Sequence, residues 1–142
     1  MEFLRGLVEA GDTVHFQPHP FTAEYVATLV RYSGDDLFYL LTEADRILAY
    51  GMLRGWDEGF EIPSLGIAVH PAARGSGLGR LMMMFLHAAA KRRNCSSVRL
   101  RVAVENKTAA TMYESLGYRF TQLEGGYRVG FLEMRSERLE QV

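Results

Sequence analysis

The spacing of apolar residues predicts two helices in the second half of the chain. The longer one begins near residue 78, where apolar positions recur every three or four residues over three turns: Leu78, Leu81, Met82, Phe85, Leu86 and Ala89. A shorter helix is predicted over residues 108–116, ended by Gly117 as the residue that follows the C-cap. In the segments that flank both helices, apolar residues do not follow this helical spacing.

Runs of apolar and aromatic residues with strand-like alternation lie between and around these helices. Residues 37–42 and 47–55 are separated by a short polar segment and predict a β-hairpin. Further strands are predicted over residues 60–69, 98–104, 118–123 and 128–135. Pro63 cannot donate a ladder hydrogen bond, so it should mark an irregularity or an edge position.

The first 35 residues carry weaker patterns. Residues 3–8 have helical spacing, and a second helix is predicted after Thr22, which can cap it, up to a stop at Ser33 and Gly34. Together these elements predict one α+β domain over residues 1–142. The expected sheet is mixed and mostly antiparallel, with helices on both faces.

Composition narrows the class of protein. The chain has 142 residues, of which 48% are hydrophobic and 23% charged, so a packed core is expected and general disorder is excluded. The single cysteine, Cys95, excludes an internal disulfide and a cysteine-rich zinc site, and we expect no metal and a reducing, cytoplasmic setting. The longest near-apolar run, residues 81–90, is shorter than the roughly 18 residues of a membrane helix. No secretory signal precedes it, so neither a membrane nor export is expected.

Charge is unevenly distributed along the chain. Residues 1–63 contain four basic and eleven acidic residues, whereas residues 64–142 contain twelve basic and six acidic ones. Residues 74–104 hold seven basic residues and no acidic one, so this stretch could accept an anion. The basic residues at 91–93 fit the carboxyl end of a helix dipole. A nucleic-acid role is disfavoured, because no aromatic and basic platform accompanies the charge.

The most informative segment joins the strand at 60–69 to the long helix. Glycines at 75, 77 and 79 leave backbone N–H groups accessible where the helix begins, an arrangement that suits a phosphate group. A Walker loop is excluded because Arg80, not lysine, follows Gly79. A dinucleotide fingerprint starting at Gly75 would need glycine in place of that arginine. The remaining pattern is Arg-x-x-Gly-x-Gly, formed by Arg74, Gly77 and Gly79.

With this pattern the sequence resembles the GNAT superfamily of acetyl-coenzyme A dependent N-acetyltransferases. The family's motif A is similar to the strand, the glycine loop and the long helix, and its motif B is similar to residues 106–120, with Asn106, Tyr113 and Gly117 in family order. The resemblance is strong over residues 64–120, moderate over 37–63 and poor over the first 35. It implies a sheet that splays between the fourth and fifth strands.

The resemblance implies acetyl-coenzyme A as cofactor and assigns residues to it. Backbone of the strand at Ile67, Ala68 and Val69 would pair with the pantetheine amides. The diphosphate would lie on the loop and helix start, at Arg74, Gly75, Ser76, Gly77, Leu78, Gly79 and Arg80. Asn106 would contact the cofactor, although it also stands where a helix cap is expected.

Amine acetylation needs a donor for the departing thiolate and a base for the nucleophile. The family pattern points to Tyr113 as the donor and as a cofactor contact, although a tyrosine there could also pack in the core. Glu61 is the first choice for the base, because it lies on the strand that carries a carboxylate in many relatives. A strand carboxylate is, however, often simply solvated. Glu105, His70 and His19 are weaker candidates.

The acceptor is expected to be a primary amine of a small molecule or a peptide. Ribosomal-protein acetyltransferases of this family carry glutamate five residues before the motif asparagine, whereas this chain has Arg101, which argues against that branch. Acidic residues at 57, 58 and 61, with Trp56 or Phe21 as an apolar wall, could attract a cationic acceptor. The alternative function is a coenzyme A binding module that has lost turnover and acts as a sensor or interaction domain. A homodimer is left open.

Overall fold

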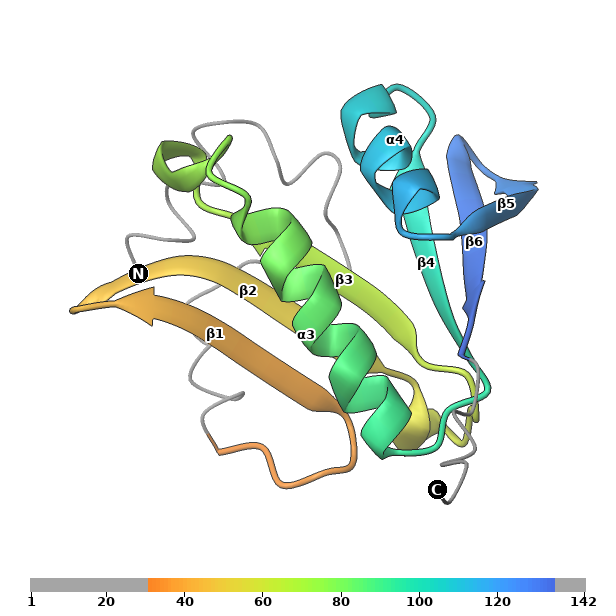
Figure 1. Ribbon diagram of the computed structural model, residues 1–142. Coiled ribbons are helices and arrows are strands. Elements are labelled where there is room, and N and C mark those ends of the chain that lie inside the picture. Colours follow the sequence, from red (N-terminus) through yellow and green to blue (C-terminus); the bar gives the residue numbers. More distant parts are fainter. Residues whose placement is uncertain (1–30, 135–142) are drawn as a thin grey trace, which may run out of the picture.

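The computed structural model describes residues 31–134, and they form one six-stranded sheet flanked by two α-helices (Figure 1). The strands are β1 (Leu37–Glu43), β2 (Arg46–Arg54), β3 (Ser64–Val69), β4 (Ser97–Ala103), β5 (Arg119–Glu124) and β6 (Tyr127–Glu133). The helices are α3 (Leu78–Arg92) and α4 (Lys107–Ser115), with short 3-10 turns η2 (Trp56–Glu58) and η3 (Pro71–Ala73). The helices predicted near residues 3–8 and after Thr22 lie outside the described residues.

The sheet has the strand order β1-β2-β3-β4-β6-β5, and its neighbours are antiparallel except for one pair. β3 and β4 run parallel and pair only at Ser64↔Arg99 and Leu65↔Leu100. Beyond these residues the two strands diverge, as Figure 1 shows. The predicted mixed, mostly antiparallel α+β sheet with an internal splay is therefore confirmed. The splay was predicted between a fourth and a fifth strand, and among the described strands it lies between the third and the fourth.

α3 and α4 cover the same face of the sheet. The side chains of Met82, Met83 and Leu86 on α3 are buried against the sheet at 3%, 0% and 0% exposure. Gly51 of β2 lets α3 approach closely, since a Cβ there would lie 2.7 Å from the Met82 sulfur. Gly117 has φ of 103°, which confirms its predicted role after the C-cap of α4. Over residues 31–134, no helix has the length and apolar character to cross a membrane.

The strand predicted over residues 60–69 was wrong in its first four residues, because β3 begins at Ser64. Residues 56–58 form the turn η2, Gly59 follows with φ of 87°, and the N–H of Phe60 bonds back to the carbonyl of Gly55 at 2.9 Å. This turn directs the chain away from the sheet until Pro63. Pro63 is buried just before β3, and its carbonyl accepts from the N–H of Arg99 at 2.9 Å. The predicted irregularity at this proline is confirmed.

Candidate active site

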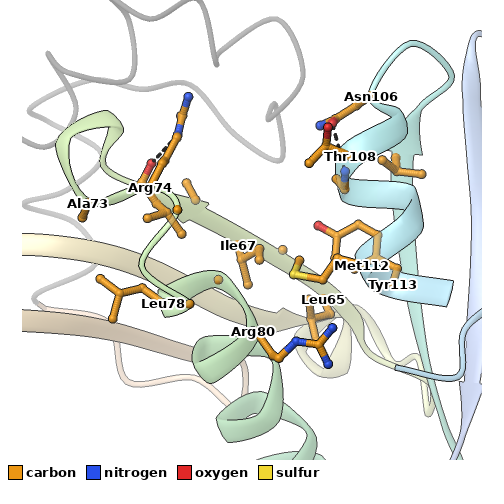
Figure 2. Close-up of a pocket in the computed structure, with 18 of the residues that line it drawn as sticks. Leu65, Ile67, Ala73, Arg74, Leu78, Arg80, Asn106, Thr108, Met112 and Tyr113 are labelled. Atoms are coloured by element: carbon orange, nitrogen blue, oxygen red, sulfur yellow. Dashed lines mark hydrogen bonds between the residues drawn. The ribbon is translucent and has the colours of Figure 1, made fainter. Parts of the chain in front are cut away.

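The splay between β3 and β4 opens into a cleft of about 690 Å³ (Figure 2). Its walls are β3 and the glycine loop on one side, and β4 and α4 on the other, with the start of α3 below the loop. Eleven residues predicted from the sequence line it: Ile67, Ala68, Val69, Arg74, Gly75, Gly77, Leu78, Gly79, Arg80, Asn106 and Tyr113. The fold thus brings the two sequence motifs to opposite walls of one cleft.

The backbone of β3 presents hydrogen-bonding groups to this cleft. At one end of the strand, Pro63 accepts from Arg99 on the β4 side, and at the other end the N–H of His70 donates to Leu48 on the β2 side at 2.8 Å. Because successive residues of a strand direct these groups to opposite neighbours, the backbone of Ile67 and Val69 faces β4. β4 no longer pairs with β3 at this level. Ile67 and Val69 can therefore bind an extended ligand in place of a strand.

The glycine loop turns the chain sharply into α3. Gly75 and Gly77 have φ of 76° and 84°, in the left-handed region that favours glycine. Gly77 is the N-cap of α3 and supplies no capping side chain, so the first N–H groups of a 15-residue helix remain available to a ligand. Their partial positive charge suits an anion.

Two arginines flank this helix start. The Nε of Arg74 donates to the carbonyl of Val69 at 3.2 Å, which holds its side chain across the loop, and desolvation lowers the pKa of its guanidinium. Nη2 of Arg80 donates to the hydroxyl of Ser115 on α4 at 2.8 Å. Arg80 thus links the two helices beside the cleft. Ser76, which was also predicted to bind the cofactor, does not line the cleft, and its hydroxyl donates back to the carbonyl of Ala73.

α4 contributes Asn106 and Tyr113 to the opposite wall. Asn106 is the N-cap of α4, and its Oδ1 accepts from the N–H of Ala109 at 3.2 Å. The capping interpretation of Asn106 is therefore confirmed, and the side chain also lines the cleft. Figure 2 shows the Tyr113 hydroxyl directed into the cleft toward β3. Desolvation raises the pKa of Tyr113 to about 12, so the phenol is protonated at neutral pH.

Behind Tyr113 lies a second polar group. The rings of Tyr113 and Tyr118 have centroids 5.9 Å apart, and the Tyr118 hydroxyl lies 2.8 Å from Nε2 of His87 on α3. Burial, aided by the charge of Lys91, lowers the pKa of His87 to about 4. A neutral imidazole therefore shares a hydrogen bond with Tyr118 and joins α3 to the segment between α4 and β5, behind the cleft.

Glu61 and the acidic residues at 57 and 58, which were proposed from sequence, lie outside the cleft lining. Glu61 is exposed, lies in the bend before β3 rather than in the strand, and does not line the cleft. Asp57 accepts from the Tyr32 hydroxyl and from the N–H of Asp35, and the hydrogen bond from Tyr32 lowers its pKa. Trp56 packs under the Arg93 guanidinium at 4.5 Å. These groups hold the segment before β1 against η2. Phe21 and His19 lie outside the described residues.

Several lining residues were not assigned to the site from sequence. The most notable is Arg101 on β4, with Leu65, Gly66, Ala73, Val102, Thr108, Ala109 and Met112 completing the walls. Glu105, a weaker candidate for the base in the sequence, also lines the cleft, in the turn after β4. In the sequence, Arg101 was one residue of the basic stretch at 74–104 and a difference from one branch of relatives. Its place in the cleft depends on where β3 and β4 part, which strand alternation within β4 alone does not reveal.

Comparison with known proteins agrees with this geometry. The model of the acetyltransferase (GNAT) family matches residues 4–118. No curated protein gave a significant sequence match.

Solved structures resemble this fold at low sequence identity. A GCN5-related N-acetyltransferase from Kribbella flavida is 20% identical, with a TM-score of 0.76 over 94% of this chain and 90% of that one. The ribosomal-protein-S18-alanine N-acetyltransferase from Escherichia coli is 23% identical, with a TM-score of 0.66 over 87% and 84%. The yncA protein from Salmonella typhimurium, solved with its cofactor acetyl-CoA, is 21% identical, with a TM-score of 0.63 over 80% and 71%.

The family model spans most of the chain, including the glycine loop, the splayed strands and Tyr113. The chain therefore belongs to the acetyltransferase (GNAT) family.

Proposed function

We propose that this protein is an N-acetyltransferase that moves an acetyl group from acetyl-coenzyme A to a primary amine, by direct attack within a ternary complex. The observation that carries the proposal is the placement of three features on one cleft: an uncapped helix start, open strand backbone and a protonated tyrosine. The neighbour solved with acetyl-CoA supports the choice of cofactor.

The cleft residues fit coenzyme A by shape and chemistry. A Cβ placed on Gly75 or Gly77 would meet no atom within 4 Å, so the loop has open space above it for a ligand. The N–H groups from Gly75 to Arg80 would hold the diphosphate, with charge assistance from Arg74 and Arg80. The backbone of Ile67 and Val69 would hold the amide groups of the pantetheine arm, as an added strand does.

Residues of the cleft would assist the reaction by donating a proton and a hydrogen bond. When bound, acetyl-coenzyme A supplies the activated acetyl group. Tyr113 would donate a hydrogen bond to the departing sulfur and serve as its proton donor. Little assistance is needed, because a thiol with a pKa of roughly 8.5 is a good leaving group. A backbone N–H near Val69 is our candidate donor to the developing oxyanion.

For the base, two carboxylates remain candidates. Glu61 is the sequence-based choice, although it lies outside the cleft lining, whereas Glu105 is the one carboxylate among the described residues that line the cleft. Glu61→Gln and Glu105→Gln separate them: the variant that loses the base shows a lower kcat/KM that recovers as pH rises and the amine loses its own proton. The other variant should keep the wild-type profile.

The test combines binding and turnover. Calorimetry with coenzyme A should show saturable binding, and a panel of primary amines should then stimulate thiol release from acetyl-coenzyme A. Binding without turnover on any amine would favour the alternative function, a coenzyme A binding sensor or interaction module. Failure to bind the cofactor would overturn both functions.

A further inference from the structure

We propose that the amine acceptor carries a carboxylate close to its amino group, and that Arg101 binds this carboxylate. The inference rests on the proposed acetyl transfer and names the acceptor class for that same site. Arg101 lies on β4 where this strand separates from β3. Leu65↔Leu100 is the last pair between β3 and β4, so Arg101 is the first residue of β4 beyond the point where the strands part.

Arg101 points to the face of the sheet opposite the helices. Its neighbours Leu100 and Val102 are buried at 2% and 4% exposure, and Leu100 belongs to the core beneath α3. Since side chains alternate along a strand, the exposed Arg101 is directed to the other face. The helix start of α3 and Tyr113 are on the helix side. An acceptor that approaches the cleft from the face opposite α3 and α4 therefore meets Arg101 at the apex of the splay.

The guanidinium of Arg101 is oriented but retains donors for a ligand. Its Cζ lies 4.5 Å from the ring centroid of Tyr127 on β6, a stacking contact that leaves the edge N–H groups of the planar fork open. Arg99, two residues earlier on the same face, is instead paired with Glu124 at 3.1 Å. Within residues 31–134 no carboxylate lies within salt-bridge distance of Arg101.

The other charged groups of the cleft have different positions. Arg74 and Arg80 bond to Val69 and Ser115 beside the glycine loop, and Glu105 lies in the turn that leads into α4. Among the described arginines that line the cleft, Arg101 is thus the one next to the point of divergence. A planar guanidinium matches a carboxylate with two parallel hydrogen bonds. The carboxylate could belong to a free amino acid or to an acidic side chain of a peptide, and the experiment distinguishes these two sources.

The experiment uses matched acceptor pairs with the full-length protein and acetyl-coenzyme A. One arm compares free amino acids with their amides, and the other compares peptides that carry Glu or Gln at the second position. We expect the carboxylate member of one arm to have a kcat/KM about 10-fold or more above its neutral partner. Arg101→Gln should remove most of that preference, Arg101→Lys should keep part of it, and Arg101→Glu should reverse it in favour of the neutral partner.

The controls separate this inference from the proposed function. The affinity for coenzyme A, measured by calorimetry, should stay within about 2-fold in all three variants, and their melting temperatures should match the wild type. Tyr127→Leu removes the stacking contact but keeps the charge, so it should weaken the preference without reversing it. Acetylation of amines with no carboxylate preference, or a preference unchanged in Arg101→Gln, overturns the inference and leaves the proposed function standing. Loss of cofactor binding in Arg101→Gln would instead assign the arginine to the cofactor.

Discussion

Leu65 and Leu100 form the last register pair between β3 and β4, and the chemistry of the cleft follows from that pairing. Before this pair the strands share backbone hydrogen bonds, with Pro63 accepting from Arg99. After it, the backbone of Ile67 and Val69 faces a cleft instead of a neighbouring strand. A sheet that opened one residue earlier or later would expose a different set of backbone groups and move Arg101 away from the apex.

Replacing Ile67 with proline tests the role of the strand backbone. The N–H of this residue faces the cleft, so Ile67→Pro removes a ligand contact without breaking the ladder to β2. Ile67→Ala is the matched control, since it loses the side chain and keeps the N–H. We expect the proline variant to bind coenzyme A about 3- to 10-fold more weakly than the alanine variant, measured by calorimetry. Equal affinities would mean that this backbone group is not used.

Replacing Gly79 with alanine should change stability and binding in opposite directions. A Cβ there would make ordinary contacts of 3.7 Å with Val69 and 3.9 Å with Met112, so the protein itself tolerates alanine. The helix should gain up to about 1 kcal/mol, because alanine loses less backbone entropy than glycine. The added methyl group would occupy space at the helix start where the diphosphate is proposed to lie.

Thermal unfolding and calorimetry check this prediction together. Gly79→Ala should raise the melting temperature by up to about 5 °C and weaken coenzyme A binding. Ala88→Gly, at an exposed position of the same helix, should lower the melting temperature and leave binding unchanged. An alanine variant that binds normally would place the ligand away from Gly79.

Removing the Tyr113 hydroxyl should slow chemistry and spare binding. Tyr113→Phe is expected to lower kcat about 10- to 100-fold, near the lower end of general acid catalysis, because a thiol is a good leaving group. Its pKa of about 12 means that ionisation of this tyrosine should not limit kcat below roughly pH 11. Tyr118→Phe is the control, since it breaks the bond to His87 and keeps the cleft hydroxyl. Parallel losses of cofactor affinity and kcat in Tyr113→Phe would make Tyr113 a packing residue.

His87 should make the stability of the fold depend on pH. Its pKa falls from about 6.5 in the unfolded chain to about 4 in the folded one, so between these values the unfolded state binds more protons. Stability should therefore fall as pH decreases from about 6.5 to 4. His87→Gln, which can still bond to Tyr118, should lack this part of the decline in chemical denaturation. Parallel curves for the two proteins would contradict the prediction.

Local pattern in the sequence was sufficient for most elements of the fold. The apolar period predicted a helix from Leu78, which is where α3 begins, and the glycine after α4 has the expected left-handed backbone. These features depend on residues close in sequence. The segment before β3 was not foreseen, because Phe60 and Ile62 have strand-like character while Gly55 and Gly59 impose a turn.

The site was predictable where it follows a local motif and not where it depends on strand pairing. The glycine loop could be named from spacing, and Tyr113 from its resemblance to the family's motif B. The cleft position of Arg101 could not, because it requires knowing which residues of β3 and β4 pair last. Glu61 was predicted as the base because it was expected to lie on a strand. That expectation was wrong, because the chain turns at Gly59 and β3 begins only at Ser64.

The proposed function depends on a diphosphate that binds at the start of α3 and its glycine loop. The most direct measurement is a calorimetric titration of the full-length protein with coenzyme A and, in parallel, with pantetheine, which lacks the diphosphate. Our account predicts saturable binding of coenzyme A and at least about 10-fold weaker binding of pantetheine. Equal affinities, or no heat with coenzyme A, would contradict it.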